Sequence, residues 1–260
     1  MADFREYHGM DASEFIVHYG VGHDRGGHSG RYPWGSGNRP KQRDGSSNNV
    51  STMNSKAGQI NEVIASDEYF KKRTTVLNGN KFGTDENNNV LYVTGLSGSG
   101  KSSFTVEMGQ KGNNTVHMDM YFEPGNYEED RKWQDKEFNK FLKKRGIPYE
   151  KIKSQNIDRQ ERWKIIDQFT DALEDFSKEQ YKKGKGVVCE GVQIADEIAC
   201  PDKNYFKGKP MVIMTTSKIR SLVNGMQRDE ISPFDLLTIA YRLKYQNSWN
   251  KAIKDLKKTV

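Results

Sequence analysis

Short runs of apolar residues recur from residue 90 onwards and predict the strands of a sheet. They cover residues 91–94, 115–118, 186–194 and 210–215, and Val, Ile, Leu and Met supply most of their apolar side chains. Runs of this kind, bounded by polar or glycine-rich turns, are typical of buried strands. Longer stretches with apolar residues at mostly helical spacing lie between them.

These intervening stretches predict helices. Within residues 158–182, Ile166, Phe169, Leu173 and Phe176 follow one another at steps of three and four. This spacing places them on one face of a helix. Further helices are predicted at residues 56–73, 103–108, 127–145, 217–226 and 234–257, with a loop at residues 78–89.

The alternation of strands and helices predicts an α/β fold. Parallel strands need long crossover connections, and the predicted strands are spaced far enough apart to contain them. We therefore expect a mostly parallel, doubly wound sheet flanked by helices. The two helices within residues 123–185 are expected to form an insertion that binds substrate.

The first 55 residues differ in composition from the rest of the chain. Nine of the 24 glycines lie within residues 1–50, and apolar residues are sparse after Val21. The hydrophobic fraction of 34% is also low for a chain that is packed throughout. We expect a flexible, polar extension at residues 1–55, a helix and linker at 56–88, and one domain at 89–260.

The composition also bears on location. No run of eighteen apolar residues is present, and the N-terminus lacks the apolar core of a signal peptide. We therefore expect a soluble, unsecreted protein with no membrane partner. The two cysteines, Cys189 and Cys200, favour a reducing cytoplasm over a disulfide framework.

Residues 95–102 match the pattern G-x-x-x-x-G-K-[ST] of the phosphate-binding P-loop. Its glycines let the backbone turn tightly and direct successive N–H groups inward, beside the start of a helix. Lys101 is then placed to reach the β- and γ-phosphates, and the Ser102 hydroxyl to ligate Mg²⁺. The alternative is a flexible linker, but a linker needs neither the preceding strand nor the following helix. The expected nucleotide contacts are Gly95, Ser97, Gly98, Ser99, Gly100, Lys101, Ser102 and Ser103.

Two carboxylates follow predicted strands downstream of this loop. Asp119 follows the strand at 115–118, and Glu190 ends the apolar run at 187–189. Ligands bind at the carboxyl ends of strands in open α/β sheets. Asp119 is a candidate general base or ligand of the metal's water shell, with a helix N-cap as the alternative. Glu190 is a candidate metal ligand.

Phosphoryl transfer also requires positive charge around the moving group. Arg220 and Arg228 flank Asn224 and Gly225, an arrangement suited to a mobile lid. Both arginines are catalytic candidates together with Lys101. Solvated arginines on a surface helix are the alternative.

Three motifs together point to a family: Gly-Leu-Ser-Gly-Ser-Gly-Lys-Ser at 95–102, Met-Asp-Met-Tyr-Phe at 118–122 and Cys-Glu-Gly-Val at 189–192. They resemble the P-loop small-molecule and nucleotide kinases, in particular the uridine kinase and phosphoribulokinase-like branch. The resemblance implies that Asp119 is the catalytic base and that Glu190 lies near Mg²⁺. The aromatic pair after Asp119 is reversed relative to the family, and residues 123–185 match no acceptor-binding pattern.

A second resemblance concerns the N-terminal extension. Residues 29–37, Ser-Gly-Arg-Tyr-Pro-Trp-Gly-Ser-Gly, with His-Tyr-Gly at 18–20, resemble a motif near the N-termini of bacteriophage and prophage-encoded proteins. The resemblance implies a phage origin, and thus a host cytoplasm, but no activity. Tyr32, Pro33 and Trp34 are candidates for an aromatic anchor on a protein partner.

These features predict a phosphotransferase that binds ATP and Mg²⁺ and moves the γ-phosphoryl group to a hydroxyl or phosphate acceptor. The expected acceptors are nucleosides, nucleotides and nucleic-acid ends. One alternative is a phage-associated ATPase or switch that hydrolyses ATP without an acceptor. Another is a nucleic-acid-binding module, because residues 206–260 hold eleven Lys or Arg against four Asp or Glu, within a chain of net charge +6.

Overall fold

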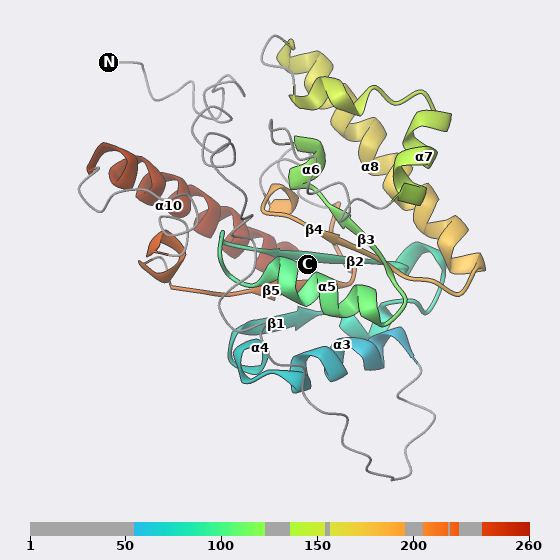
Figure 1. Ribbon diagram of the computed structural model, residues 1–260, viewed down its shortest axis with the longest axis horizontal. Helices are drawn as coiled ribbons and strands as arrows, with labels where there is room; N and C mark the ends of the chain where they lie inside the picture. The colour runs from blue at the N-terminus through green and yellow to red at the C-terminus, as the bar shows by residue number, and fades with distance from the viewer. Residues whose placement is uncertain (1–54, 123–135, 154–156, 196–204, 218, 224–235) are drawn as a thin grey trace, which may run out of the picture.

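The computed structural model describes residues 55–122, 136–153, 157–195, 205–217, 219–223 and 236–260. Within them, one sheet is formed by β1 (Thr74–Leu77), β2 (Val90–Gly95), β3 (Asn114–His117), β4 (Val187–Glu190) and β5 (Met211–Met214). The strand order is β1-β5-β2-β4-β3 (Figure 1). β2 to β5 run parallel, and β1 is an antiparallel edge strand beside β5.

Helices cover both faces of this sheet (Figure 1). One face packs against α3 (Lys56–Ser66), α4 (Glu68–Arg73) and α5 (Lys101–Gln110). The other packs against α6 (Asp119–Phe122), α7 (Lys136–Lys144), α8 (Arg159–Lys182) and α10 (Leu236–Thr259). Short 3₁₀ turns lie at Gly79–Lys81, Glu86–Asn88 and Tyr149–Lys153. The predicted α/β class, with a mostly parallel sheet flanked by helices, is confirmed.

The alternation of side chains along β2 divides the interior into two cores. Val90 and Tyr92 belong to the core that includes α7, α8 and α10, whereas Leu91 and Val93 belong to the core that includes α3, α4 and α5. All six residues of β2 are buried. A central parallel strand covered on both faces has this pattern, so the predicted buried strand is confirmed.

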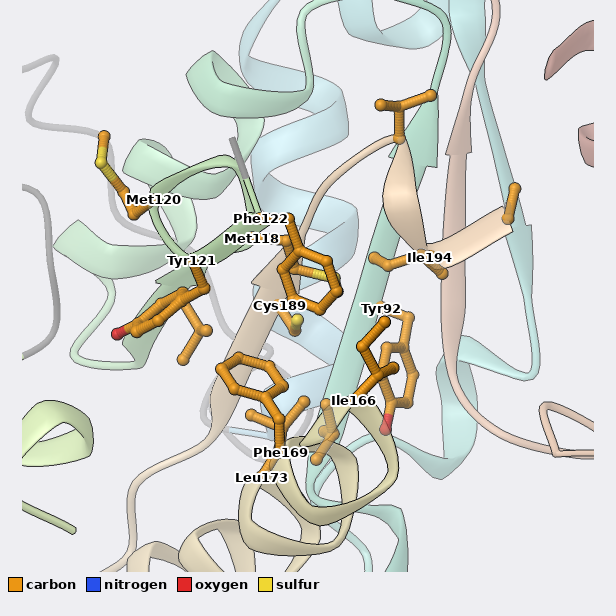
Figure 2. Packing of buried hydrophobic residues seen from close by; sticks show 14 of the residues in the cluster. Tyr92, Met118, Met120, Tyr121, Phe122, Ile166, Phe169, Leu173, Cys189 and Ile194 are labelled. Carbon is orange, nitrogen blue, oxygen red and sulfur yellow. The ribbon is translucent and has the colours of Figure 1, made fainter. Parts of the chain in front are cut away.

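The larger core is built around apolar side chains of α8, among them Ile166, Phe169 and Leu173 (Figure 2). Phe169 lies between 5.0 and 5.5 Å, centroid to centroid, from the rings of Tyr121, Phe122 and Phe138. It is fully buried. The stretch at 123–185, predicted as an insertion, therefore contributes α8 to the main core as the crossover between β3 and β4.

Three local predictions are wrong in detail. The helix predicted at 56–73 is two helices, because Asp67 is extended and its carboxylate accepts a hydrogen bond from the Tyr69 N–H at 2.8 Å, which caps α4. The stretch predicted as a helix and linker at 56–88 also contains β1. The strand predicted at 186–194 ends at Glu190.

Several predictions fall partly outside the described residues. The helix predicted at 127–145 is described as α7, and that predicted at 217–226 as the helical residues 219–223. The predicted extension, except for Ser55, and Cys200 lie outside, whereas Cys189 is buried and free. Among the helices of the described segments, none is long and apolar enough to cross a membrane.

Candidate functional site

The glycine-rich loop at residues 95–102 connects the carboxyl end of β2 to the N-terminus of α5. Gly95, Gly98 and Gly100 have φ values of 153°, 69° and 93°, a region that residues with a side chain rarely adopt. A Cβ at Gly95 would lie 2.2 Å from the carbonyl oxygen of Met214, and one at Gly100 would lie 2.8 Å from Tyr69 Cε1. At these two positions the loop needs glycine for its conformation and for space.

Lys101 and Ser102 begin α5 beside the ends of β3 and β4. The Ser102 hydroxyl donates to Glu190 Oε1 at 3.0 Å, and His117 Nδ1 lies 2.8 Å from the same oxygen. The exposed fractions of Glu190, His117 and Lys101 are 2%, 6% and 8%. Glu190 and His117 are partners in the register of β3 and β4. The fold thus gathers a hydroxyl, an ammonium, a carboxylate and an imidazole in one buried cluster.

The carboxylate of this cluster is held in its ionised form. Burial by itself raises the pKa of Glu190, because a charge is costly to desolvate. The hydrogen bond and charge interaction with His117, the charge of Lys101 and the Ser102 hydroxyl act in the opposite direction. Their combined effect leaves the pKa of Glu190 below its ordinary value, so a negative charge persists beside the loop.

The cluster has unsatisfied polar atoms. Glu190 Oε2 and His117 Nε2 are buried and have no hydrogen-bond partner among the described residues. Buried polar atoms are normally paired, so two orphans in one cluster are consistent with a ligand at this position. Mg²⁺ prefers oxygen ligands and is usually held by one or two protein side chains together with waters and phosphates. Ser102 and Glu190 fit that requirement.

The remaining residues of the loop differ in their hydrogen bonds and in their burial. The Ser99 N–H donates to the Leu96 carbonyl at 3.1 Å, and Ser99 Oγ is buried without a partner in the described part of the chain. Lys101 Nζ donates to the same Leu96 carbonyl at 3.2 Å. Ser103 is half-buried in the first turn of α5. The carbonyl oxygens of Ser97 and Gly98 accept hydrogen bonds from the hydroxyl groups of Ser221 and Tyr69, which lie outside the loop.

Asp119 and the two arginines are only partly placed. Asp119 is the first residue of α6, directly after Met118, whose N–H donates to the Glu190 carbonyl at 2.9 Å. The backbone of Asp119 therefore starts near the cluster, while its side chain lies outside what the structure describes. Arg220 is exposed within the helical residues 219–223, and Arg228 lies outside the described residues.

Sequence reasoning missed three residues that contact the loop or its cluster, and a fourth, Gln246, that supports one of them. The Tyr69 hydroxyl donates to the Gly98 carbonyl at 3.5 Å, and the Ser221 hydroxyl donates to the Ser97 carbonyl at 2.7 Å. Gln246 of α10 in turn donates to Ser221, and His117 contacts Glu190. Only His117 carried a local signal, as a polar residue near the end of an apolar strand.

Comparison of the chain with protein-family profiles, curated proteins and solved structures finds no match. In the segments that the structure describes, no group of three or more His, Cys, Asp and Glu side chains is arranged to hold a metal ion.

Proposed function

We propose that residues 95–102 form a P-loop that binds Mg-ATP, and that the chain transfers the γ-phosphoryl group to a hydroxyl or phosphate acceptor. The observation that carries this proposal is the hydrogen bond from Ser102 Oγ to Glu190 Oε1 at 3.0 Å. It joins the hydroxyl that ligates Mg²⁺ in such loops to a carboxylate at the end of the adjacent strand. The P-loop NTPase fold belongs to the same proposal, because β2, the loop and α5 supply the strand–loop–helix order that the motif requires.

Each part of the cluster has a role in this proposal. The backbone N–H groups of the loop and the N-terminus of α5 bind the phosphates. Lys101 exchanges its hydrogen bond to the Leu96 carbonyl for one to a phosphate oxygen. Ser102 and Glu190 would hold Mg²⁺, which when bound neutralises charge on the phosphate oxygens. His117 keeps Glu190 ionised and fixes its orientation.

The transfer step uses residues at the edge of the cluster. An acceptor oxygen attacks the γ-phosphorus while the bond from that phosphorus to the bridging oxygen breaks and ADP leaves. Asp119 takes the proton of a hydroxyl acceptor, and Arg220 and Arg228 neutralise the charge of the moving group. Nucleosides, nucleotides and nucleic-acid ends are the acceptor classes, and residues 123–185 are the stretch assigned to binding them.

The test is to incubate the full chain with ATP labelled at the γ-phosphate, in pools of nucleosides, nucleotides and 5′-hydroxyl oligonucleotides. We expect label to pass to a member of one pool in the presence of Mg²⁺. Asp119→Asn should lower the rate of transfer by a factor of about 10² or more, because the acceptor proton loses its base, with ATP affinity nearly unchanged. Asp255→Asn, which alters an exposed carboxylate of α10 outside the stretch assigned to the acceptor, is the matched control and should behave as wild type.

Two outcomes would count against this function. Label that appears only as inorganic phosphate, at the same rate in every pool, would identify an ATPase or switch instead of a transferase. Unchanged transfer by the Asp119→Asn variant would remove Asp119 from the role of base.

A further inference from the structure

The Ser97 carbonyl of the glycine-rich loop is held from outside the loop by a two-step hydrogen-bond chain. Ser221 Oγ donates to this carbonyl at 2.7 Å, and Gln246 Nε2 of α10 donates to Ser221 Oγ at 3.1 Å. Ser221 and Gln246 are 1% and 4% exposed. Burial of these two side chains limits their exchange with water, so the hydrogen bonds that they donate are costly to lose.

The hydrogen bond to Ser97 fixes the direction of the next N–H group. A trans peptide unit is planar, and its C=O and N–H bonds point in opposite directions. Because the Ser97 oxygen points toward Ser221, the Gly98 N–H points away from Ser221 and from the helical residues 219–223.

The conformation of Gly98 does not by itself fix this orientation. Gly98 has a φ of 69°, and glycine adopts positive and negative φ values with similar ease, so the peptide unit before it can rotate at low cost. The anion-binding property of such a loop depends on successive N–H groups converging on one point. A contact that selects one orientation of the Ser97–Gly98 peptide therefore acts on phosphate affinity.

We propose that Ser221, held by Gln246, is a positioning residue that orients the Ser97–Gly98 peptide so that the Gly98 N–H binds nucleotide phosphate. The inference rests on the proposed function, since it assigns a supporting residue to the same phosphate site. It also links α10, more than 100 residues downstream in the sequence, to the loop.

The first measurement is the affinity of the full chain for ADP with Mg²⁺, by isothermal titration calorimetry. Ser221→Ala removes one net hydrogen bond, so we expect its dissociation constant to rise about threefold to tenfold. Ser221→Thr keeps the hydroxyl and should restore most of the affinity. Ser66→Ala is the matched control, because Ser66 Oγ also donates to a backbone carbonyl, that of Val63 at 2.8 Å, but not in the loop.

The second measurement follows the NMR signal of the Ser97–Gly98 peptide. It distinguishes a change in the orientation of this peptide from a general loss of stability. Serine labelled with ¹³C at the carbonyl and glycine labelled with ¹⁵N give NMR signals from four Ser–Gly peptides, those ending at Gly30, Gly37, Gly98 and Gly100. We expect Ser221→Ala to shift the Gly98 signal of the free protein and to reduce its response to ADP. The Gly30 and Gly37 signals should not change.

Wild-type affinity for ADP in the Ser221→Ala variant, or an unchanged Gly98 signal, would overturn the inference and leave the proposed function intact. If the alanine variant does not fold, Ser221→Thr and Gln246→Met serve as the test. Gln246→Met keeps the Ser221 hydroxyl but removes the hydrogen bond that Gln246 donates to it. An unchanged Gly98 signal in Gln246→Met would then overturn it. Failure of the wild-type chain to bind ADP would instead overturn the proposed function.

Discussion

At the scale of single residues, Glu190 links the stability of the protein to pH. Its pKa lies below the ordinary value of 4.5. The folded chain therefore stabilises the ionised carboxylate more than the unfolded chain does. This contribution is present above about pH 4.5 and is lost as the pH falls through the lower folded pKa. Acid should therefore lower the contribution of the buried cluster to stability, even in the absence of a nucleotide.

The variant Glu190→Gln tests this linkage. At pH 7 we expect a free energy of unfolding about 1 to 3 kcal/mol lower than that of wild type, because hydrogen bonds to a charged partner are lost. The difference should shrink as the pH falls below 4.5. Denaturant titrations between pH 3 and 7 measure it, with the exposed Glu179→Gln as control. A difference that stays constant across this range would contradict an ionised Glu190.

The residues of the site divide into those that are predictable from sequence and those that are not. Lys101, Ser102 and Glu190 were predictable because a short motif and a strand end fix their positions locally. The structure brings Ser102 and Glu190 into contact. Tyr69 and Ser221 reach the loop from segments that precede and follow it in the chain. No spacing rule marks such contacts, because they depend on how α4 and residues 219–223 pack in three dimensions.

At the scale of elements, α8 is a structural part of the domain. Its N-cap, Asp158, accepts hydrogen bonds from the N–H groups of Gln160 and Glu161 at 2.8 and 3.2 Å, and its apolar face packs on the sheet through residues such as Phe169 and Leu173. Its bounds match the predicted helix within one residue, because the spacing of apolar residues was regular and the cap was a good one.

Replacement of Phe169 tests the structural role of α8. Phe169→Ala should lower the free energy of unfolding by about 3 to 5 kcal/mol, since it removes a buried ring from the centre of the larger core. Its neighbour Gln168 is exposed, and Gln168→Ala should change stability by less than about 0.5 kcal/mol. Thermal unfolding followed by far-ultraviolet circular dichroism compares the two. A separate early transition of α8, with the rest of the chain unaffected, would show that it is an independent insertion.

The elements that the sequence did not predict have physical explanations. β1 has only four residues, and its hydrogen bonds to β5 join segments more than 130 residues apart. Its β-branched residues favour a strand, but so short a run forms one only through a partner that lies far away in the sequence. Asp67 divides the first predicted helix because its side chain caps the second helix better than it continues the first.

At the scale of the whole molecule, the sheet provides one edge at which the loop, β3 and β4 meet. The fold class was predictable because apolar strands alternate with amphipathic helices throughout residues 90–260. The order of the strands was not predictable from the sequence, because it depends on the face of the sheet over which each crossover helix passes. That order places β4 directly beside β2, and this adjacency brings Glu190 to Ser102.

Residues 95–102 are proposed to bind the phosphates of a nucleotide. The most direct test is the equilibrium affinity for Mg-ATP of wild type, Lys101→Ala and Lys164→Ala, where Lys164 is an exposed lysine of α8. Loss of a charge-assisted hydrogen bond predicts that Lys101→Ala binds about tenfold to hundredfold more weakly, while Lys164→Ala matches wild type. Equal affinity of the Lys101→Ala variant and wild type, or no binding by wild type, would contradict nucleotide binding by this loop.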